Sequence, residues 1–424
     1  MRTRTLLFLL SPVVLLACEK IPEHRPEPSA AAIPLDKVAQ MLSELPLETV
    51  HLNEVHRAVN SSSGNGYDEE YMMKDLFETP GQGVGGHTGS KTPSSIDRPL
   101  RDLILDYASQ KSATKSGGED WGWIDRLCSS DLQIYWPYSE NWDGETMPVF
   151  TYDPGNDEEI NVGWRVVQNA DGGRQIERIE VDEALAQTCP VWVVNRNSDS
   201  GYCSLEVMRR EHPEWDNGGG ALIVGGPSSE RSSAFLSPST FSSSFAGQPV
   251  SPSSGPACKI KRLPTATKAL VIKDLTMNRH YDSWFAGGSE FFIKAGSVAD
   301  FQASTEAELQ LYSPAITDFM VVVRRSQKGK AVPCNTVLVS DWTQQLTHIA
   351  FMIVEDDGGK QTQWKCSAMV KVNSKSYGFE LSIPLNTRDD IVWRGQLSRN
   401  YIEATDKVSG HFGDVDITFE IVDY

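Results

Sequence analysis

The sequence lacks the short motifs that identify the common hydrolases and zinc-binding modules. It contains no Gly-x-Ser-x-Gly, no His-Glu-x-x-His and no Cys-x-x-Cys. The first motif carries the nucleophile of α/β-hydrolases, the second holds the zinc ion of many metalloproteases, and the third is typical of structural zinc sites. We therefore expect no zinc-finger module, whereas a catalytic triad built from distant residues would leave no such motif.

Positive charge is also scarce in this chain. The 39 Lys and Arg residues face 57 Asp and Glu residues, which gives a formal net charge of −18, and no stretch forms a basic face. Proteins that bind DNA or RNA neutralise phosphates with clustered Lys and Arg. The charge balance therefore predicts no nucleic-acid partner.

Hydrophobic residues make up only 39% of the chain, yet it contains 15 Phe, 12 Tyr and 11 Trp. Intrinsically disordered chains are poor in aromatic residues, so these rings indicate a folded core. At about 150 residues per domain, a length of 424 residues predicts two or three domains.

Long apolar runs are absent except at the N-terminus. Arg2 and Arg4 precede the apolar run Leu6–Leu16, which is too short to span a bilayer comfortably, and Ala17 precedes Cys18. This pattern predicts a signal peptide over residues 1–17.

The end of that segment, Leu15-Leu16-Ala17-Cys18, resembles the lipobox of bacterial lipoprotein precursors. The resemblance implies that the chain is cut before Cys18 and that Cys18 receives acyl chains such as palmitate, which hold the protein to a membrane. In that family an Asp directly after the lipidated cysteine often retains the protein at the inner membrane. Residue 19 is Glu, so we expect an outer-membrane lipoprotein of the cell envelope.

The local patterns divide the chain into segments of different character. Prolines recur in residues 19–34, and residues 225–257 are rich in Gly, Ser and Pro. Helical spacing of apolar residues predicts helices at 35–45, 52–59, 68–77 and 97–110. We therefore expect a signal peptide at 1–17, a tether at 18–34, a helical segment at 35–110, a β-rich middle domain at 111–226, a linker at 227–258 and a β-sandwich at 259–424.

Two-residue alternation predicts the strands of both β-rich parts. In the middle domain the expected strands are 132–138, 147–152, 160–167, 175–181, 191–195 and 221–224. In the C-terminal part they are 268–275, 290–295, 319–324, 336–339, 348–354, 366–372, 379–385, 391–397 and 415–421. Short strands without long intervening helices indicate an antiparallel sandwich, so the expected fold is mainly β with N-terminal helices, of the α+β class.

Six cysteines follow Cys18 in the sequence, at positions 128, 189, 203, 258, 334 and 366. An oxidising compartment would permit disulfides, for which 189–203 and 334–366 are the pairings closest in sequence. Buried free cysteines are the alternative.

Several aromatic residues gather between residues 121 and 142. Trp136, Tyr138 and Trp142 alternate with polar residues such as Asn141 and Asp143. Sugar rings stack on flat aromatic faces while their hydroxyls bind polar side chains, so these three residues are candidates for a glycan-binding platform. The alternative is that they pack within the core of the middle domain.

The segment Gly287-Gly288-Ser289-Glu290-Phe291-Phe292-Ile293-Lys294 resembles the start of the calcium- and lipid-binding β-sandwiches of the protein kinase C type, with Glu-Phe where that family has Asp-Pro. Val354-Glu355-Asp356-Asp357 is similar to the second acidic loop of that family. The resemblance implies a calcium site. Its candidate ligands are Asp282, Glu290, Asp356 and Asp357, because Ca²⁺ binds oxygen ligands from adjacent loops. Alternatively, Asp356-Asp357-Gly358-Gly359 forms a simple hairpin turn.

We expect this chain to act as a non-enzymatic binding or adhesion module of the cell envelope. Its overall plan resembles the multidomain surface lipoproteins of Gram-negative bacteria, which implies a glycan, host matrix or another envelope protein as ligand. The alternative is an extracellular hydrolase with its active site between the middle domain and the sandwich.

Overall fold

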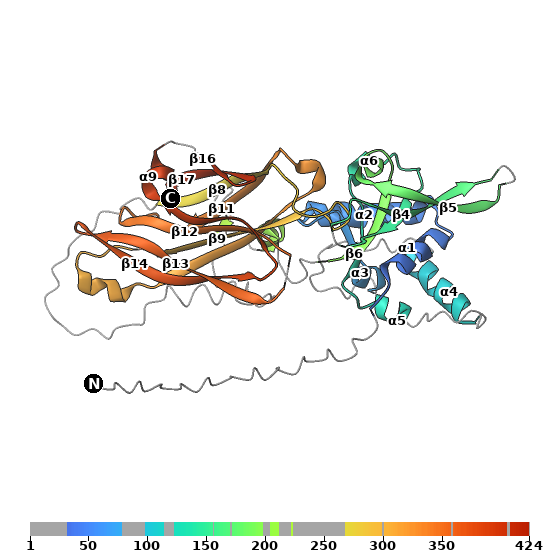
Figure 1. The fold of residues 1–424 in the computed structure, drawn as a ribbon, viewed down its shortest axis with the longest axis horizontal. Helices are drawn as coiled ribbons and strands as arrows, with labels where there is room; N and C mark the ends of the chain where they lie inside the picture. Colours follow the sequence, from blue (N-terminus) through green and yellow to red (C-terminus); the bar gives the residue numbers. More distant parts are fainter. Residues whose placement is uncertain are drawn as a thin grey trace, which may run out of the picture.

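A computed structural model describes residues 32–78, 98–113, 123–155, 157–169, 172–197, 204–211, 222–223, 268–298, 301–357, 359–404 and 408–423. The expected signal peptide, Cys18, nearly all of the tether and the expected linker lie outside these ranges. The fold is mainly β with N-terminal helices, as the sequence predicts. Figure 1 shows a body of helices and strands beside a larger body made mainly of strands. The first body, which includes the N-terminal helices, is hereafter the middle domain, and the second is the sandwich.

The first two predicted helices, at 35–45 and 52–59, are both present. Helix α1 (Leu35–Glu44) and helix α2 (Thr49–Gly64) are joined by a short connection that contains Pro46. Leu42 and Leu52 are fully buried on the faces that carry the helical spacing. Helix α4 (Leu100–Ala113) confirms a third predicted helix, and the short helix α5 (Ile124–Leu127) follows it.

The predicted helix at 68–77 is wrong in its first half. Residues Glu70–Met72 form strand β1, and only Met73–Phe77 form a helix, α3. Strand β1 pairs antiparallel with β2 (Leu132–Tyr135), and all three of its residues are buried. Pairing with a strand about 60 residues later overrides the local helical spacing, because that pairing satisfies the buried backbone groups.

A six-stranded sheet forms the centre of the middle domain, in the order β1-β2-β6-β3-β4-β5. Its remaining elements are β3 (Val149–Tyr152), β4 (Ile160–Gln168), β5 (Arg174–Asp182), β6 (Val191–Arg196), the short helix α6 (Glu183–Ala186) and the 3₁₀ turn η1 (Ser139–Asn141). Side chains of α1 and α2 share one hydrophobic core with Ile134, Trp136 and Trp192. The N-terminal helices and the sheet therefore belong to one folded unit.

In the part of the chain that the structure describes, ten strands build the sandwich in two sheets. They are β8 (Lys268–Met277), β9 (Ser289–Val298), β10 (Pro314–Val323), β11 (Ala331–Val339), β12 (Leu346–Glu355), β13 (Gln361–Val372), β14 (Lys375–Asn386), β15 (Asp390–Ser398), β16 (Val408–Phe412) and β17 (Val415–Asp423). One sheet runs β10-β9-β12-β13-β14 with β15 also paired to β12, and the other contains β16-β17-β8-β11. All pairs among these ten strands are antiparallel, and each predicted strand is present.

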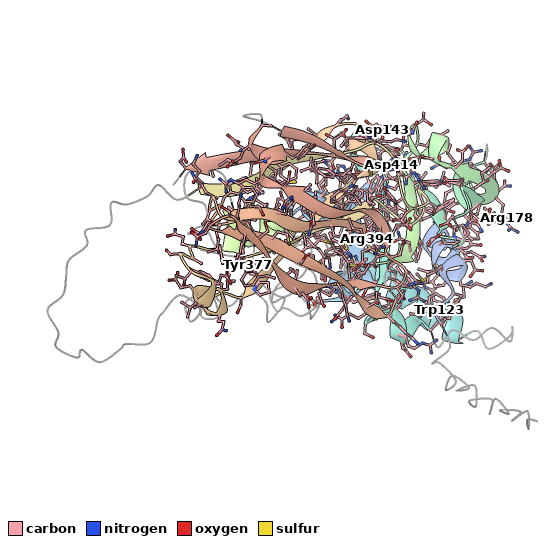
Figure 2. All side chains as sticks on the ribbon, turned by 60° about the vertical axis from the view of Figure 1, so that its left-hand side comes forward. Trp123, Asp143, Arg178, Tyr377, Arg394 and Asp414 are labelled. Atoms are coloured by element: carbon pink, nitrogen blue, oxygen red, sulfur yellow. The ribbon has the colours of Figure 1, made fainter. Side chains whose placement is uncertain are left out.

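Among the sandwich strands that the structure describes, β16 is the only one that the sequence did not predict. Between its strands the sandwich also contains two 3₁₀ turns and one short helix. These are η4 (Glu306–Leu311), η5 (Arg325–Gln327) and α9 (Arg399–Glu403). Phe351 and Phe419 meet between the two sheets with ring centroids 5.8 Å apart. In Figure 2 the labelled Trp123 and Arg178 belong to the middle domain, and Tyr377 and Arg394 to the sandwich.

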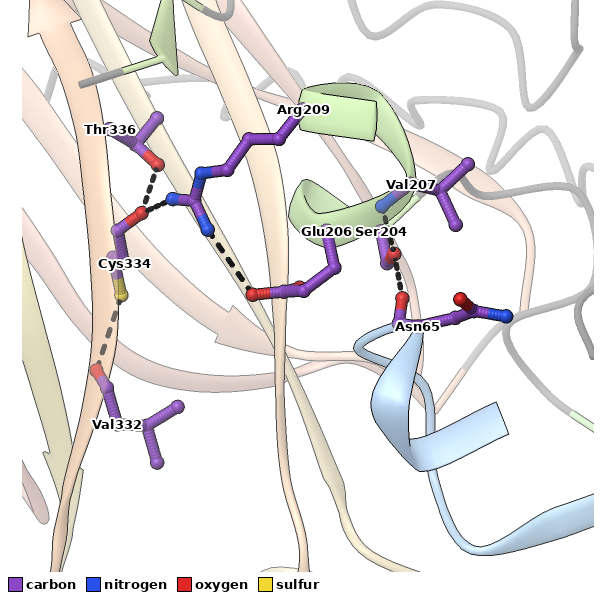
Figure 3. A network of polar contacts seen from close by, with 8 residues as sticks. All are labelled: Asn65, Ser204, Glu206, Val207, Arg209, Val332, Cys334 and Thr336. Carbon is purple, nitrogen blue, oxygen red and sulfur yellow. Dashed lines mark hydrogen bonds and ion pairs between the residues drawn. The ribbon is translucent and has the colours of Figure 1, made fainter. Parts of the chain in front are cut away.

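The chain reaches the sandwich earlier than the expected boundary at residue 226. Helix α7 (Leu205–Glu211) places Leu205 and Met208 in the sandwich core, and β7 (Leu222–Ile223) pairs with β11 in parallel. Figure 3 shows the polar contacts around α7.

These contacts connect α7 to both bodies of the molecule. Arg209 donates to the main-chain carbonyl of Cys334 on β11 and pairs with Glu206 at 3.2 Å. The Ser204 hydroxyl donates to the carbonyl of Asn65 at the end of α2 (Figure 3). Residues 204–211 therefore join the N-terminal helices to the sandwich, although they precede the expected linker.

Candidate metal centre

Three carboxylates converge at one end of the sandwich. Ligand oxygens of Asp282, Glu290 and Glu355 all lie within 4.8 Å of one another. Two oxygens that share a Ca²⁺ ion at about 2.4 Å can be at most about 4.8 Å apart, so this spacing is compatible with one common ion. The sequence predicted Asp282 and Glu290 as ligands but not Glu355.

The strand ladder positions two of these side chains. Glu290 is the second residue of β9, and Glu355 is the last residue of β12. Glu355 lies opposite Phe291 on one side and Asp390, the first residue of β15, on the other. Asp282 comes from the loop between β8 and β9. Sheet hydrogen bonds therefore fix the main chain of Glu290 and Glu355, whereas Asp282 belongs to a loop.

A second group of acidic residues lies beside the first. Asp356 and Asp357 follow β12 directly, and Asp389 precedes β15. Asn386 organises two of them, because its main-chain N–H donates to Asp389 at 2.7 Å and its side-chain amide donates to Asp356 at 3.1 Å. The structure thus brings all four predicted ligands to one end of the sandwich and adds Glu355, with Asp389 beside them.

Burial and mutual repulsion disfavour the charged forms of these acids. Burial, followed by the neighbouring Asp282 and Glu290, raises the pKa of Glu355 well above its usual value. Burial likewise raises the pKa of Asp282. Burial, and next the charges of Asp282 and Asp390, raise the pKa of Asp357 to about 7. A bound divalent cation would reverse this effect, because its charge favours the ionised carboxylates.

Glu355 is the member of the cluster that ordinary packing explains least. Its side chain is fully buried, and neither carboxylate oxygen accepts a hydrogen bond from a donor group among the described residues. Buried carboxyl oxygens normally have a donor or an ion as partner, because desolvation without one is costly. The groups that face Glu355 are themselves acids, Asp282 and Glu290. This arrangement requires shared protons or a cation.

The donor set determines which cations fit. All the candidate ligands are carboxylate oxygens, with the Asn386 side-chain amide nearby. Ca²⁺ accepts six to eight oxygens in flexible geometry, whereas Zn²⁺ and Cu²⁺ favour imidazole or thiolate ligands. A site with at least three converging carboxylates therefore suits a hard cation such as Ca²⁺ better than Zn²⁺ or Cu²⁺.

The structure corrects the sequence hypothesis for Trp136. Its side chain is fully buried and packs against Trp142 and Trp192, with ring centroids 5.2 and 5.7 Å away. The neighbouring Tyr135 is fully buried as well, on the other face of the sheet. Both faces of β2 are covered, so Trp136 is a core residue and offers no face to a sugar.

Tyr138 and Trp142 stand at the edge of that core. Tyr138 adopts a left-handed backbone conformation with a φ of 57°, and its hydroxyl donates to Glu183 at 2.8 Å. Trp142 is half-buried, and its indole N–H donates to the carbonyl of Thr146 at 2.9 Å. The three predicted aromatic residues therefore do not form a shared flat surface, because the first one belongs to the interior.

The cysteines that the structure describes are free thiols. Cys334 is buried in the sandwich core, and Cys128, Cys189 and Cys366 are half-buried. The pairing 334–366 is therefore wrong, and the alternative of free cysteines holds for these two. Cys203, the expected partner of Cys189, lies outside the described residues.

Comparison of the chain with protein-family models, characterised protein sequences and solved structures finds no significant match. Within the described residues, no helix has the length and apolar character needed to cross a bilayer.

Proposed function

We propose that this protein is a lipid-anchored, calcium-binding module of the cell envelope that acts by binding and not by catalysis. The observation that carries the proposal is the position of Glu355, fully buried without a hydrogen-bond donor and facing two further carboxylates. A Ca²⁺ ion at this place would neutralise the acids and supply the missing partner.

The location of the cluster also supports this proposal. Each of its acids lies at a strand end or in a loop at one end of the sandwich, where side chains from separate segments can surround one ion. The strand ladder fixes Glu290 and Glu355, so these two acids need little reorganisation to accept a cation. Calcium at this place would stabilise the fold and support ligand binding, which agrees with a non-enzymatic role.

Calcium titration tests the proposal directly. We expect isothermal calorimetry to detect Ca²⁺ binding to the mature chain, and Glu355→Gln to abolish it. At a free Ca²⁺ concentration of 100 times the Kd, binding should stabilise the fold by about 2.7 kcal/mol, measurable as a rise in Tm. The matched control is Glu306→Gln, a change at an exposed glutamate of the sandwich that pairs with Lys375. Absence of Ca²⁺ binding to the unaltered chain would refute the proposed function.

The membrane anchor requires a separate test. We expect metabolic labelling with palmitate to modify the chain, and Cys18→Ser to abolish the label and release the protein from the membrane fraction. A chain that stays membrane-bound without label would contradict lipidation at Cys18 without affecting the calcium site.

A further inference from the structure

The loop between β8 and β9 contributes both to the acidic cluster and to the interface between the sandwich and the middle domain. Asp282 supplies a carboxylate to the acidic cluster. Two residues later, Trp284 and Phe285 are fully buried in a cluster made otherwise of middle-domain side chains. These side chains are Tyr135, Val149, Val181, Ala186, Val191 and Val193. The candidate metal ligand Asp282 and an apolar contact between the two bodies, made by Trp284 and Phe285, are therefore two residues apart.

Specific hydrogen bonds seat this loop against the middle domain. The Trp284 indole N–H donates to the carbonyl of Glu159 at 2.9 Å. The Asn195 side-chain amide donates to the carbonyl of Phe285 at 3.0 Å, and the main-chain N–H of Gly288 donates to Asp68 at 2.7 Å. A Cβ atom on Gly288 would lie 2.9 Å from the carbonyl oxygen of Val323, so the close approach requires glycine.

Arg325 links the same loop to the middle domain by charge. Its guanidinium donates to the main-chain carbonyl of Asp282 at 3.0 Å and pairs with Glu183 at 3.0 Å. The side chain is only 3% exposed, which makes this a buried interaction. The backbone at Asp282 thus depends on an ion pair between the sandwich and α6.

Only one of the three acids belongs to a loop. Glu290 and Glu355 are held by pairing with Val322 and Asp390 in the sheet. Asp282 has no strand ladder, so when the acids are ionised their repulsion acts mainly on its loop. A bound cation removes this repulsion and favours the loop conformation that buries Trp284 and Phe285.

We propose that a divalent cation held by Asp282, Glu290 and Glu355 locks the middle domain onto the sandwich through the loop that carries Trp284 and Phe285. This inference rests on the proposed function, because it requires the calcium site. It adds regulation by calcium, because the relative placement of the two bodies then depends on whether the ion is bound. A ligand surface formed by both bodies would depend on calcium in the same way.

Linkage provides the test, because coupling between two sites is reciprocal. Asn195→Ala removes hydrogen bonds to the loop from the middle-domain side without touching the acidic cluster. We expect it to weaken Ca²⁺ binding about fivefold or more in calorimetry of the full mature chain. The matched control is Asn161→Ala, which loses a side-chain hydrogen bond to Tyr152 inside the middle domain and should leave the Ca²⁺ affinity unchanged.

A second measurement follows the shape of the molecule. In small-angle X-ray scattering we expect a smaller radius of gyration in Ca²⁺ than in chelator, and no such change in Glu355→Gln. If circular dichroism shows that Asn195→Ala does not fold, the Ca²⁺ affinity is measured on Trp284→Phe instead. This variant keeps an aromatic ring in the interface and loses the hydrogen bond to the carbonyl of Glu159. Equal Ca²⁺ affinity in the interface variant and the control, with unchanged scattering, would overturn the inference while leaving the calcium site intact. Absence of Ca²⁺ binding to the unaltered chain would instead remove the proposed function itself.

Discussion

The side-chain amide of Asn195 on β6 donates a hydrogen bond to the main-chain carbonyl of Phe285 at 3.0 Å, across the boundary between the middle domain and the sandwich. Asn195 and the Phe285 ring are both fully buried. A buried polar contact of this kind fixes a single docking geometry, because any other placement leaves the amide or the carbonyl without a partner.

Phe285 should therefore be essential for the stability of the docked molecule. We expect Phe285→Ala to lower the free energy of unfolding by about 3–5 kcal/mol, because it opens a cavity in the interface. Chemical denaturation followed by tryptophan fluorescence measures this loss. Leu311→Ala removes a side chain that is 79% exposed and should change stability by no more than about 0.5 kcal/mol. Equal effects of the two changes would contradict the buried interface.

Trp136 should behave as a core residue. We expect Trp136→Ala to cost about 3–5 kcal/mol of unfolding free energy, because the indole is fully buried beside Trp142 and Trp192. Trp142→Ala should cost less, since that ring is half-buried. Urea denaturation of the two variants gives the comparison. A stable Trp136→Ala variant that loses only sugar binding would restore the surface hypothesis.

Lys294 and Asp318 form a buried ion pair in the sandwich, with 3.4 Å between Nζ and Oδ2 and side-chain exposures of 7% and 6%. The ammonium also donates to the carbonyl of Pro384 at 2.9 Å. Lys294→Met should destabilise the sandwich by about 3–5 kcal/mol, because it leaves the Asp318 charge buried alone. The double change Lys294→Met/Asp318→Leu should recover much of the loss in a double-mutant cycle. A double variant no more stable than Lys294→Met would show that the pair is not the cause.

Glu69 should make stability depend on pH. Burial, and next the charges of Asp68 and Glu140, raise its pKa well above the usual value, while Arg324 acts in the opposite direction. A raised pKa in the folded state means that the contribution of Glu69 to stability is complete below the unfolded pKa and declines as the pH rises through the folded pKa. Glu69→Gln mimics the protonated form and keeps an acceptor for Ser139.

Thermal unfolding across pH tests this assignment. The difference in Tm between Glu69→Gln and the unaltered chain should be small near pH 4 and should grow in favour of the variant towards pH 7.5. Each Tm is compared at the same pH, so other titrating groups contribute equally to both proteins. A difference that stays constant with pH would show that Glu69 keeps the same charge throughout.

Cys334 should resist alkylation in the native protein. Burial in the sandwich core blocks access of the reagent to the thiol. Burial also raises the pKa of the thiol, so less of the reactive thiolate forms. We expect iodoacetamide to modify Cys334 only after denaturation, as read by peptide mass spectrometry without reduction. A cross-linked peptide joining Cys334 to Cys366 would contradict the free thiols of the structure.

Local periodicity predicted the elements well because it acts within a few residues. Alternation along 379–385 and 415–421 marks strands whose one face is buried, and both strands are present, as β14 and β17. It failed at Glu70–Met72, where all three side chains are buried and the partner strand is distant in sequence. Four of the acids at this end of the sandwich were also singled out from the sequence, since acids at loop positions are visible without a fold.

The sequence by itself determined most of the helices and strands, the mainly β fold with N-terminal helices, and the acids at Asp282, Glu290, Asp356 and Asp357. Only the tertiary structure decided that Glu355 completes the cluster, because a strand-end glutamate becomes a candidate ligand through its neighbours on β9 and β15. It also decided that Trp136 lies in the core and that Trp284 joins the two bodies. The physical reason is that backbone periodicity is local, whereas the burial of a given face depends on which distant segment covers it.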